Sequence, residues 1–488
     1  MEDETLDLTL VIDIGKSNAK LMLLDAAGTV VERYGRVNTG VTSPLGYPAL
    51  DVHGLQQWMQ SSLRASAYVQ RCGHVIASTH GAAFVALDET GLAWEPLDYE
   101  FEDVALDSAA DAAFHAASGD FRQTLSPDLP AGLNAARQLN WLKSTQPAAW
   151  RRTRTLLPYP QYWAWLLSGV ACSEVSSLGC HTHLWSPVTG DFSDLAVSKG
   201  WALLFAPMRP AWEVLGTVRP EVATAWGLPA ACLVHVGVHD SNACLVRYFD
   251  RASHVDPQAV ALTIVSSGTW TVLMAPGAPA DALVAKRDML GNVDVTGRMT
   301  PTARFMGGRE FAAIAAGADP QTASIETLRQ LVASQTFALP SFANQGGPFA
   351  DRVGTLEQGG QALDEHQASR LSASARATLA ATYCAQLTAW LIHFLWEGSA
   401  VQKSRVVVEG PLAHNTVFMQ MLQSILPDSL CLSSTDTLEG TARGAWLLSR
   451  WGNEAAQQAA KPVQVEPVEG LRQYHDAWLH RVNAAVSN

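Results

Sequence analysis

Two apolar runs of this chain each end at a small glycine-containing turn, and these turns constrain the fold most. The first run leads from Val11 into Gly15-Lys16-Ser17-Asn18, and the second leads from Ile264 into Ser266-Ser267-Gly268-Thr269. A strand that ends in such a turn leaves backbone N–H groups free to bind an anion. Two such turns, roughly 250 residues apart, predict two related halves that grip one polyphosphate.

Length and composition favour a globular protein with two large domains. The chain has 488 residues, which is more than a single hydrophobic core usually organises. Hydrophobic residues make up 48% of the chain and charged residues 16%, so a wholly disordered chain is excluded. The net charge is −13 and Lys and Arg do not cluster, which argues against a nucleic-acid partner.

Cysteine usage and the termini bear on the compartment. Seven cysteines are spaced irregularly, without a Cys-x-x-Cys pair, and this pattern predicts reduced thiols in the cytoplasm. The N-terminus is acidic, unlike a signal peptide. No apolar stretch approaches the ~18 residues that span a bilayer, so we expect no membrane partner. His181 and His183 have no carboxylate nearby in the sequence, and a metal site there is not favoured.

Hydrophobic periodicity predicts that both halves open in the same way. Strands are expected at 8–14, 19–24, 30–34, 74–78, 82–87 and 234–238 in the first half, with helices at 53–67, 134–143, 160–167 and from 243. Strands are expected at 259–266, 269–274 and 405–409 in the second half, with helices at 368–397, 415–426 and 441–451. We interpret this as a diverged duplication, each half built on a mixed five-stranded sheet.

The first turn also matches the last three residues of a Walker A motif, Gly15-Lys16-Ser17. That motif requires a glycine where Leu10 stands and a helix after Ser17, where a strand is expected, so a P-loop fold is excluded. Taken alone, each turn is equally compatible with an ordinary hairpin. Lys16 and Lys20 favour phosphate binding, and Asp13 would then require a bridging Mg²⁺.

Asp240 lies where a strand is expected to give way to a helix, directly after His239. An aspartate in that position often caps the helix. Alternatively, it accepts a proton from an alcohol that attacks phosphorus. His80-Gly81 lies in the turn between two expected strands, where His80 either hydrogen-bonds a polyol or has no role. Asp98-Tyr99 follows a hairpin and either binds sugar hydroxyls or lies in a solvated loop.

In this order the motifs resemble those of the FGGY carbohydrate kinases, members of the actin-like ATPase superfamily, over about residues 8–450. The resemblance rests on the segments Asp13–Lys20, Leu139–Trp150, Tyr162–Ser176, Val238–Ala243 and Ser266–Trp270. Three positions depart from the family pattern. Lys16 replaces a small hydroxyl residue, Gln161 replaces an aspartate, and Pro411 lies in the adenosine-binding region.

The resemblance implies an α/β fold with two ribonuclease H-like (actin-like ATPase) domains facing a central cleft. Residues 1–247 would bind the sugar and residues 248–488 the nucleotide, with ATP and Mg²⁺ as cofactors. Asp240 would be the general base, and Asp13 would hold the metal of Mg-ATP, directly or through water. Nucleotide and phosphate contacts are expected from Asp13, Gly15, Lys16, Ser17, Asn18, Lys20, Ser267, Gly268, Thr269, Gly410 and Asn415, and sugar contacts from His80, Gly81, Asp98, Tyr99, His239 and Asp240.

The substrate is expected to be a small sugar. The His239-Asp240 pair and the Ser-Ser-Gly-Thr-Trp loop are closer to rhamnulose kinases than to glycerol kinases, which favours L-rhamnulose or L-fuculose. Xylulose, another pentulose or a polyol is the alternative, and a homodimer is left open. Two other classes share the fold: a non-catalytic sugar or nucleotide sensor, against which Asp240 argues, and an actin-like or chaperone-like ATPase, which would hydrolyse ATP without sugar.

Overall fold

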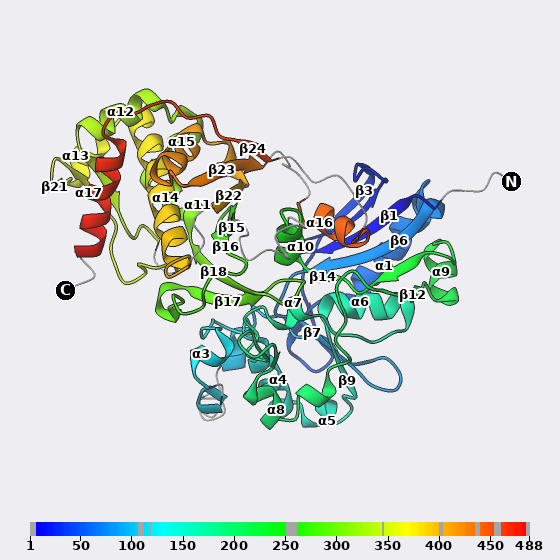
Figure 1. The fold of residues 1–488 in the computed structure, drawn as a ribbon. Coiled ribbons are helices and arrows are strands. Elements are labelled where there is room, and N and C mark those ends of the chain that lie inside the picture. The colour runs from blue at the N-terminus through cyan, green and yellow to red at the C-terminus, as the bar shows by residue number, and fades with distance from the viewer. Residues whose placement is uncertain are drawn as a thin grey trace. The chain divides into compact units, whose positions relative to one another are not determined.

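The computed structural model describes residues 6–105, 112, 114–117, 119–249, 261–343, 346–399, 404–434, 440–452 and 460–484. The chain forms two compact units (Figure 1). The first comprises Met1–Phe249, Gly291–Met299 and Leu438–Gln457, and the second comprises Asp250–Leu290, Thr300–Thr437 and Gln458–Asn488. Two segments of the first unit therefore lie beyond residue 247, where the sequence placed the boundary. Each unit contains a sheet with helices, and the predicted α/β class is confirmed.

The first unit is built on a seven-stranded sheet with the order β12-β13-β6-β1-β2-β3, and β14 also pairs with β6. Its strands are β1 (Leu8–Ile14), β2 (Asn18–Leu24), β3 (Val30–Val37), β6 (Cys72–Thr79), β12 (Val214–Thr217), β13 (Leu233–His235) and β14 (Val238–His239). β1 runs antiparallel to β2 and parallel to β6. Every side chain of β1 except that of Asp13 is buried, because the sheet is covered on both faces.

Helices cover the two faces of this sheet (Figure 1). One face carries α1 (Val52–Ala65), α6 (Tyr159–Ser168) and α9 (Pro220–Trp226), and the other carries α10 (Asp240–Val246) and α16 (Gly440–Leu448). A Cβ atom added at Gly444 would lie 1.7 Å from the carbonyl oxygen of Ala243. Only glycine therefore lets α16 approach α10 so closely, and α16 supports the helix that begins at Asp240.

A smaller subdomain extends the first unit. A three-stranded sheet of β7 (Phe84–Leu87), β8 (Leu92–Trp94) and β9 (Thr155–Pro158) shares a hydrophobic core with α4 (Ala135–Thr145) and α5 (Pro147–Trp150). The remaining elements are β4 (Val41–Thr42), β5 (Pro48–Ala49), α3 (Phe121–Thr124), α7 (Val175–Leu178), β10 (Trp185–Ser186), β11 (Asp191–Phe192) and α8 (Asp194–Ser198).

The second unit is built on another seven-stranded sheet, with the order β17-β18-β16-β15-β22-β23-β24. Its strands are β15 (Ala261–Ser267), β16 (Thr271–Met274), β17 (Met289–Val293), β18 (Met299–Phe305), β22 (Ser404–Glu409), β23 (Ser429–Ser434) and β24 (Ala460–Pro462). Gly291–Val293 of β17 and Met299 of β18 are counted with the first unit. The helices are α11 (Gly307–Ala315), α12 (Ile325–Ala333), α13 (Glu365–Ser369), α14 (Ala373–Leu395), α15 (Thr416–Ile425) and α17 (Leu471–Ala484), and a three-stranded sheet joins β19 (Thr336–Leu339), β20 (Thr355–Gln358) and β21 (Gln361–Ala362).

The two sheets repeat one arrangement, as the duplication predicts. The path β3-β2-β1-β6-β13 in the first unit and the path β18-β16-β15-β22-β23 in the second have the same order and the same strand directions. The prediction of five strands per sheet is nevertheless wrong. β12 and β14 extend the first sheet, and β17 and β24 extend the second. β12, β14 and β24 are too short for an alternation of apolar and polar residues to reveal them in the sequence. β17 is longer and follows a 3₁₀ helix, Ala285–Arg287.

Two further predictions are corrected. The helix expected over 368–397 is two helices, because Asp364 caps α13 and Ser372 caps α14 by accepting a hydrogen bond from the Ala375 N–H. The strand expected over 234–238 is divided into β13 and β14 at Gly237, which has a φ of 90°. Among the described residues, no helix has the length and apolar character needed to cross a membrane.

Candidate active site

The first glycine turn joins β1 to β2 as a tight hairpin. The Gly15 N–H donates to the Asn18 carbonyl oxygen at 2.9 Å, which closes the turn. Asn38 then fixes it from outside: its side-chain amide donates to the Gly15 carbonyl oxygen at 2.8 Å, and its N–H donates to the Ser17 carbonyl oxygen at 2.9 Å. The sequence therefore identified the turn correctly but gave no sign of the residue that holds it.

Three parallel strands end beside this turn. β1 lies next to β6, so that Asp13 is opposite Ser78 on one side and Lys20 on the other. β14 pairs with β6 on its far side, with His239 opposite Thr79. Functional groups commonly gather at the carboxyl ends of such strands.

Lys16 at the tip of the turn contacts the loop after β8. Its ammonium group forms an ion pair with the Asp98 carboxylate and lies 3.4 Å from Glu100. It also lies 5.1 Å from the centre of the Tyr99 ring, which is 5.4 Å from the His80 ring. Two regions predicted to bind different ligands, the first glycine turn and the 98–100 loop, are thus in direct contact.

His80 follows β6 and is buried between aromatic rings. Its Nδ1 is 2.9 Å from the Gly81 carbonyl oxygen, and the Tyr159 ring lies 5.3 Å away. Its Nε2 is buried and has no hydrogen-bond partner among the described residues. Burial lowers the pKa of His80, so that the ring is neutral at pH 7.

His239 is held between Gly81, Cys180 and Asp240. A Cβ atom added at Gly81 would lie 2.9 Å from the His239 Nε2, so glycine leaves room for the ring. The same nitrogen lies 3.6 Å from the Cys180 sulfur and 3.2 Å from the Asp240 Oδ1. We name the connected group the polar cluster. Its members are Lys16, His80, Gly81, Asp98, Tyr99, Cys180, His239 and Asp240.

The charges within this cluster are coupled. Burial alone would lower the pKa of His239, but Cys180 and Asp240 raise it above its ordinary value. Burial would likewise raise the pKa of the Cys180 thiol, yet His181 and His239 lower it. His239 therefore favours the protonated form and keeps a positive charge beside Asp240.

Asp240 presents one oxygen atom that is held and one that is open. Its Oδ1 accepts hydrogen bonds from the Ser241 N–H at 2.6 Å and the Ser241 hydroxyl at 3.3 Å, and it also faces His239. Its Oδ2 has no hydrogen-bond donor among the described residues, and the side chain is 31% exposed. Helix α10 begins at Asp240 with His239 at its cap position, so Asp240 is not the N-cap.

A buried glutamate that the sequence did not single out orders the backbone before Asp240. The His239 N–H donates to the Ser176 hydroxyl at 3.3 Å, and this hydroxyl donates to Glu174 at 2.6 Å. Glu174 also caps α7 by accepting from the Ser176 and Ser177 N–H groups. Burial raises the pKa of Glu174 to about 7. In the sequence, Glu174 was marked only by the Ser-Glu-x-Ser motif in which it lies.

The second glycine turn joins β15 to β16 and is closed by a hydrogen bond of 2.9 Å from the Gly268 N–H to the Trp270 carbonyl oxygen. The Ser267 hydroxyl donates to the Glu409 carbonyl oxygen and accepts from the Leu412 N–H at 3.0 Å. This hydroxyl therefore connects the turn to the corner after β22. Gly268 and Thr269 are exposed at the tip.

Glycines let three segments meet around this turn. A Cβ atom at Gly410 would lie 1.9 Å from the Ser267 carbonyl oxygen, and one at Gly308 would lie 2.5 Å from the Gly268 carbonyl oxygen. The Gly308 N–H donates to the Thr269 carbonyl oxygen at 3.2 Å. The turn is thus enclosed by the corner after β22 and by the first residues of α11, which present backbone N–H groups.

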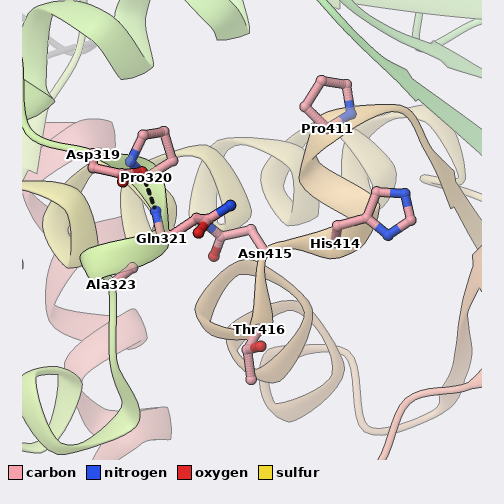
Figure 2. A pocket seen from close by; sticks show the side chains of 8 residues that line it. All are labelled: Asp319, Pro320, Gln321, Ala323, Pro411, His414, Asn415 and Thr416. Carbon is pink, nitrogen blue, oxygen red and sulfur yellow. Dashed lines mark hydrogen bonds between the residues drawn. The ribbon is translucent and has the colours of Figure 1, made fainter.

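Two adjoining hollows open beside the turn. The smaller, of about 160 Å³, is lined by Ser267, Gly268, Gly307, Gly308, Phe311, Pro320, Pro411, Leu412 and Asn415. The larger, of about 580 Å³, is lined by Asp319, Pro320, Gln321, Ala323, Pro411, His414, Asn415 and Thr416 (Figure 2). They share Pro320, Pro411 and Asn415, and we name them together the double pocket. The larger hollow alone has the size of a small-molecule site.

Asn415 and Pro411 occupy helix starts within the double pocket. The Asn415 Oδ1 caps α15 by accepting from the Phe418 N–H at 3.0 Å, and Figure 2 shows its side chain and that of Gln321 pointing toward each other. Pro411 is the first residue of a 3₁₀ helix, Pro411–His414. A backbone N–H at the first position of a helix has no partner within the helix, so the helix loses no hydrogen bond by having proline there.

Within the part of the chain that the structure describes, no group of three His, Cys, Asp or Glu side chains could hold a metal ion. His181 and His183 instead contact backbone carbonyl oxygens, those of Leu133 and Ser126, at 3.0 Å.

Comparison with known proteins gives concordant results. The family model "FGGY family of carbohydrate kinases, N-terminal domain" matches residues 125–246, and "Carbohydrate kinase FGGY, C-terminal domain" matches residues 259–459. An L-fuculokinase of Salmonella typhi is 24% identical over 284 residues. That match covers 56% of this chain and 58% of the fuculokinase.

Solved structures extend the similarity over the whole chain. A carbohydrate kinase from Novosphingobium aromaticivorans is 32% identical with a TM-score of 0.85, covering 99% of this chain and 100% of that one. A xylulose kinase from Rhodospirillum rubrum is 18% identical with a TM-score of 0.72, covering 98% of each chain. The latter identity supports a shared fold only.

Proposed function

Because the chain belongs to the FGGY family of carbohydrate kinases, we propose that it transfers the γ-phosphoryl group of ATP to a hydroxyl of a small sugar. Two sites would divide this work. The polar cluster of the first unit binds the sugar that accepts the phosphoryl group, and the double pocket of the second unit binds the nucleotide.

The observation that carries the proposal is the Asp240 carboxylate. Its Oδ1 is fixed by the two donors of Ser241, while its Oδ2 receives no hydrogen bond from the residues that the structure describes. A carboxylate oriented in this way can accept the proton of a sugar hydroxyl as that oxygen attacks phosphorus. His80 supports the sugar assignment, because its buried and unpaired Nε2 is suited to a hydrogen bond with a polyol.

Nucleotide binding is supported by the backbone of the second unit. Phosphoryl transfer demands mainly positioning and neutralisation of charge. The Gly268-Thr269 turn and the first N–H groups of α11 would bind phosphate oxygens. Adenosine would occupy the larger hollow beside Gly410 and Asn415. In the first unit, Ser17, Asn18 and Lys20 would add donors for the transferred phosphoryl group, and Gly15, whose N–H closes the turn, would let the phosphate approach the backbone.

Mg²⁺ fits this arrangement through one protein carboxylate. Asp13 is partly exposed at the end of β1, and Mg²⁺ is commonly held by one or two carboxylates together with substrate phosphates and water. When bound, the ion would neutralise phosphate charge. Asp13 would hold it directly or through water.

The acceptor is proposed to be L-rhamnulose or L-fuculose. The fuculokinase match and the His239-Asp240 pair support this choice. Xylulose, another pentulose or a polyol is the alternative acceptor. L-Rhamnulose, L-fuculose and xylulose are all uncharged ketoses with several hydroxyl groups that His80 and Asp98 could bind.

A coupled assay of ADP release over ketoses, pentuloses and polyols tests the proposal. We expect release that depends on one sugar class, and we expect Asp240→Asn to reduce kcat by about 10²–10⁴-fold, the range of a lost general base. The variant should keep the wild-type melting temperature. Full activity of Asp240→Asn would remove Asp240 from the mechanism. ATP hydrolysis without sugar would favour an interaction ATPase, and nucleotide binding without turnover would favour a sensor.

A further inference from the structure

The ammonium group of Lys16 is engaged on the side of the sugar residues. It forms an ion pair with Asp98, whose side chain is 12% exposed, and lies 3.4 Å from Glu100. The Lys16 side chain itself is 23% exposed. A partly buried, charge-assisted pair of this kind is stronger than a surface contact. A phosphate in contact with this ammonium would compete with both carboxylates for its three N–H donors.

The other neighbours of Lys16 also belong to the polar cluster. The ammonium lies 5.1 Å from the centre of the Tyr99 ring, within the range of a cation–π interaction. Tyr99 in turn contacts His80 with the ring centres 5.4 Å apart. Lys16 therefore connects to the buried, unpaired Nε2 of His80 through a single aromatic ring.

Lys20, the second lysine of this hairpin, is better placed than Lys16 to bind phosphate. Lys20 lies on β2 opposite Asp13, the residue proposed to hold Mg²⁺. Lys16 and Lys20 are thus two lysines of one hairpin whose structural neighbours differ. This difference provides a matched pair of variants.

We propose that Lys16 is a specificity-determining residue of the sugar site, where it orients Asp98 and selects an uncharged polyhydroxy acceptor, and that it does not bind the triphosphate. The inference rests on the proposed kinase function. Lys16 is one ammonium beside two carboxylates, Asp98 and Glu100, with Asp240 in the same cluster. With the protonated His239 counted beside Lys16, three carboxylates still face two cations, so a sugar acid would meet net repulsion. Neutral hydroxyls would instead find an acceptor in Asp98 and a donor in Lys16.

Lys16→Met and Lys20→Met separate the two roles. AMP-PNP with Mg²⁺ is titrated into each full-length variant by calorimetry, and the Michaelis constant of the best sugar is measured. We expect Lys16→Met to raise the sugar Michaelis constant at least tenfold while the AMP-PNP dissociation constant stays within twofold of wild type. Lys20→Met should show the reverse. Weaker AMP-PNP binding in Lys16→Met, comparable to that in Lys20→Met, would overturn the assignment.

Asp98→Asn supplies a second test that does not depend on how Lys16→Met folds. The asparagine Oδ1 can still accept the Glu100 N–H bond, which measures 3.0 Å to Asp98, while the ammonium loses one negative partner. We expect an aldonic acid to inhibit this variant at least threefold more strongly than wild type. Unchanged inhibition would contradict the charge argument. Wild type that binds AMP-PNP but phosphorylates no sugar would refute the proposed function alone, because the nucleotide titrations would still report on Lys16.

Discussion

Substitutions at two glycines, Gly410 and Gly268, should separate folding from nucleotide binding. Gly268 lines the smaller hollow of the double pocket and Gly410 precedes Pro411, which lines both hollows, but the surroundings of the two glycines differ. A Cβ atom at Gly410 would lie 1.9 Å from the Ser267 carbonyl oxygen. The residue also has a φ of 76° and a ψ of −162°, a conformation almost restricted to glycine. At Gly268 the nearest atom to an added Cβ is the Trp270 carbonyl oxygen at 3.7 Å, an ordinary contact.

The magnitudes follow from these contacts. For Gly410→Ala, backbone strain of about 1–3 kcal/mol and overpacking of about 1–3 kcal/mol together give about 2–6 kcal/mol. A unit of roughly 200 residues loses about 2–4 °C of melting temperature per kcal/mol, so we expect a loss of about 4–24 °C. Gly268→Ala should stay within about 0.5 kcal/mol of wild type, as an exposed substitution without a clash.

Gly268→Val then tests ligand approach in a folded protein. Its methyl groups would project into the smaller hollow and separate phosphate oxygens from the turn. Losing one charge-assisted hydrogen bond costs about 1.5–3 kcal/mol, which corresponds to a rise of roughly 10–150-fold in the Michaelis constant for ATP. The constant for the sugar should change less than threefold.

Differential scanning calorimetry and steady-state kinetics on the same preparations provide the readouts. Gly268→Ala serves as the control for Gly268→Val, because it adds one methyl without reaching far into the hollow. A Gly410→Ala variant with wild-type melting temperature would refute the packing of the turn against the corner after β22. A Gly268→Val variant that raised the sugar constant more than the ATP constant would refute the assignment of this turn to the nucleotide.

Two further predictions concern the segment that carries Asp240. Because the pKa of His239 is raised, the stabilisation from its positive charge is complete below pH 6.5 and is lost as the pH rises through the elevated pKa; the titratable groups around it are Glu174, Cys180, His80 and Asp240. We therefore expect kcat to fall at alkaline pH in wild type and this fall to be absent from the pH–rate profile of His239→Gln. A His239→Gln profile identical to that of wild type would count against the coupling of these charges. Gly444→Ala should lower the melting temperature by several degrees and kcat by more than tenfold, because the added Cβ would displace α16 from α10. Calorimetry measures the melting temperature and the ADP-release assay measures kcat. Wild-type values of the melting temperature and of kcat would contradict the packing of α16 against α10.

The sequence predicted the central strands well because their signals are local. β1 coincides with the expected range 8–14, since a buried strand of seven residues is followed directly by a glycine turn. The division between α13 and α14 was missed because an apolar helical pattern outweighed the cap at Ser372. The Asp364–Gln367 capping box was the available signal, and it marks the start of α13.

The sequence named every member of the polar cluster except Cys180 as a candidate site residue, but it did not show which members contact each other. His80, Asp98 and Asp240 were identified from turns and from family motifs. The pairing of Lys16 with Asp98 could not be predicted from the sequence, because the two residues are 82 positions apart and only the fold brings them together. Cys180 has the same character, since its contact with His239 spans 59 residues. Local patterns thus identify candidate groups, whereas their pairing depends on the tertiary structure.

The remaining departure from the family pattern, Gln161, has a structural explanation that leads back to Asp240. The Gln161 side-chain amide donates to the carbonyl oxygens of Val236 at 3.2 Å and of Gly237 at 3.1 Å. These atoms lie at the break between β13 and β14, where a Cβ atom at Gly237 would be 2.7 Å from the Ala77 carbonyl oxygen. An ionised aspartate could only accept hydrogen bonds and would face two carbonyl oxygens here. Because the break directs the chain into His239-Asp240, the donor at position 161 stabilises the backbone on which the proposed general base is mounted.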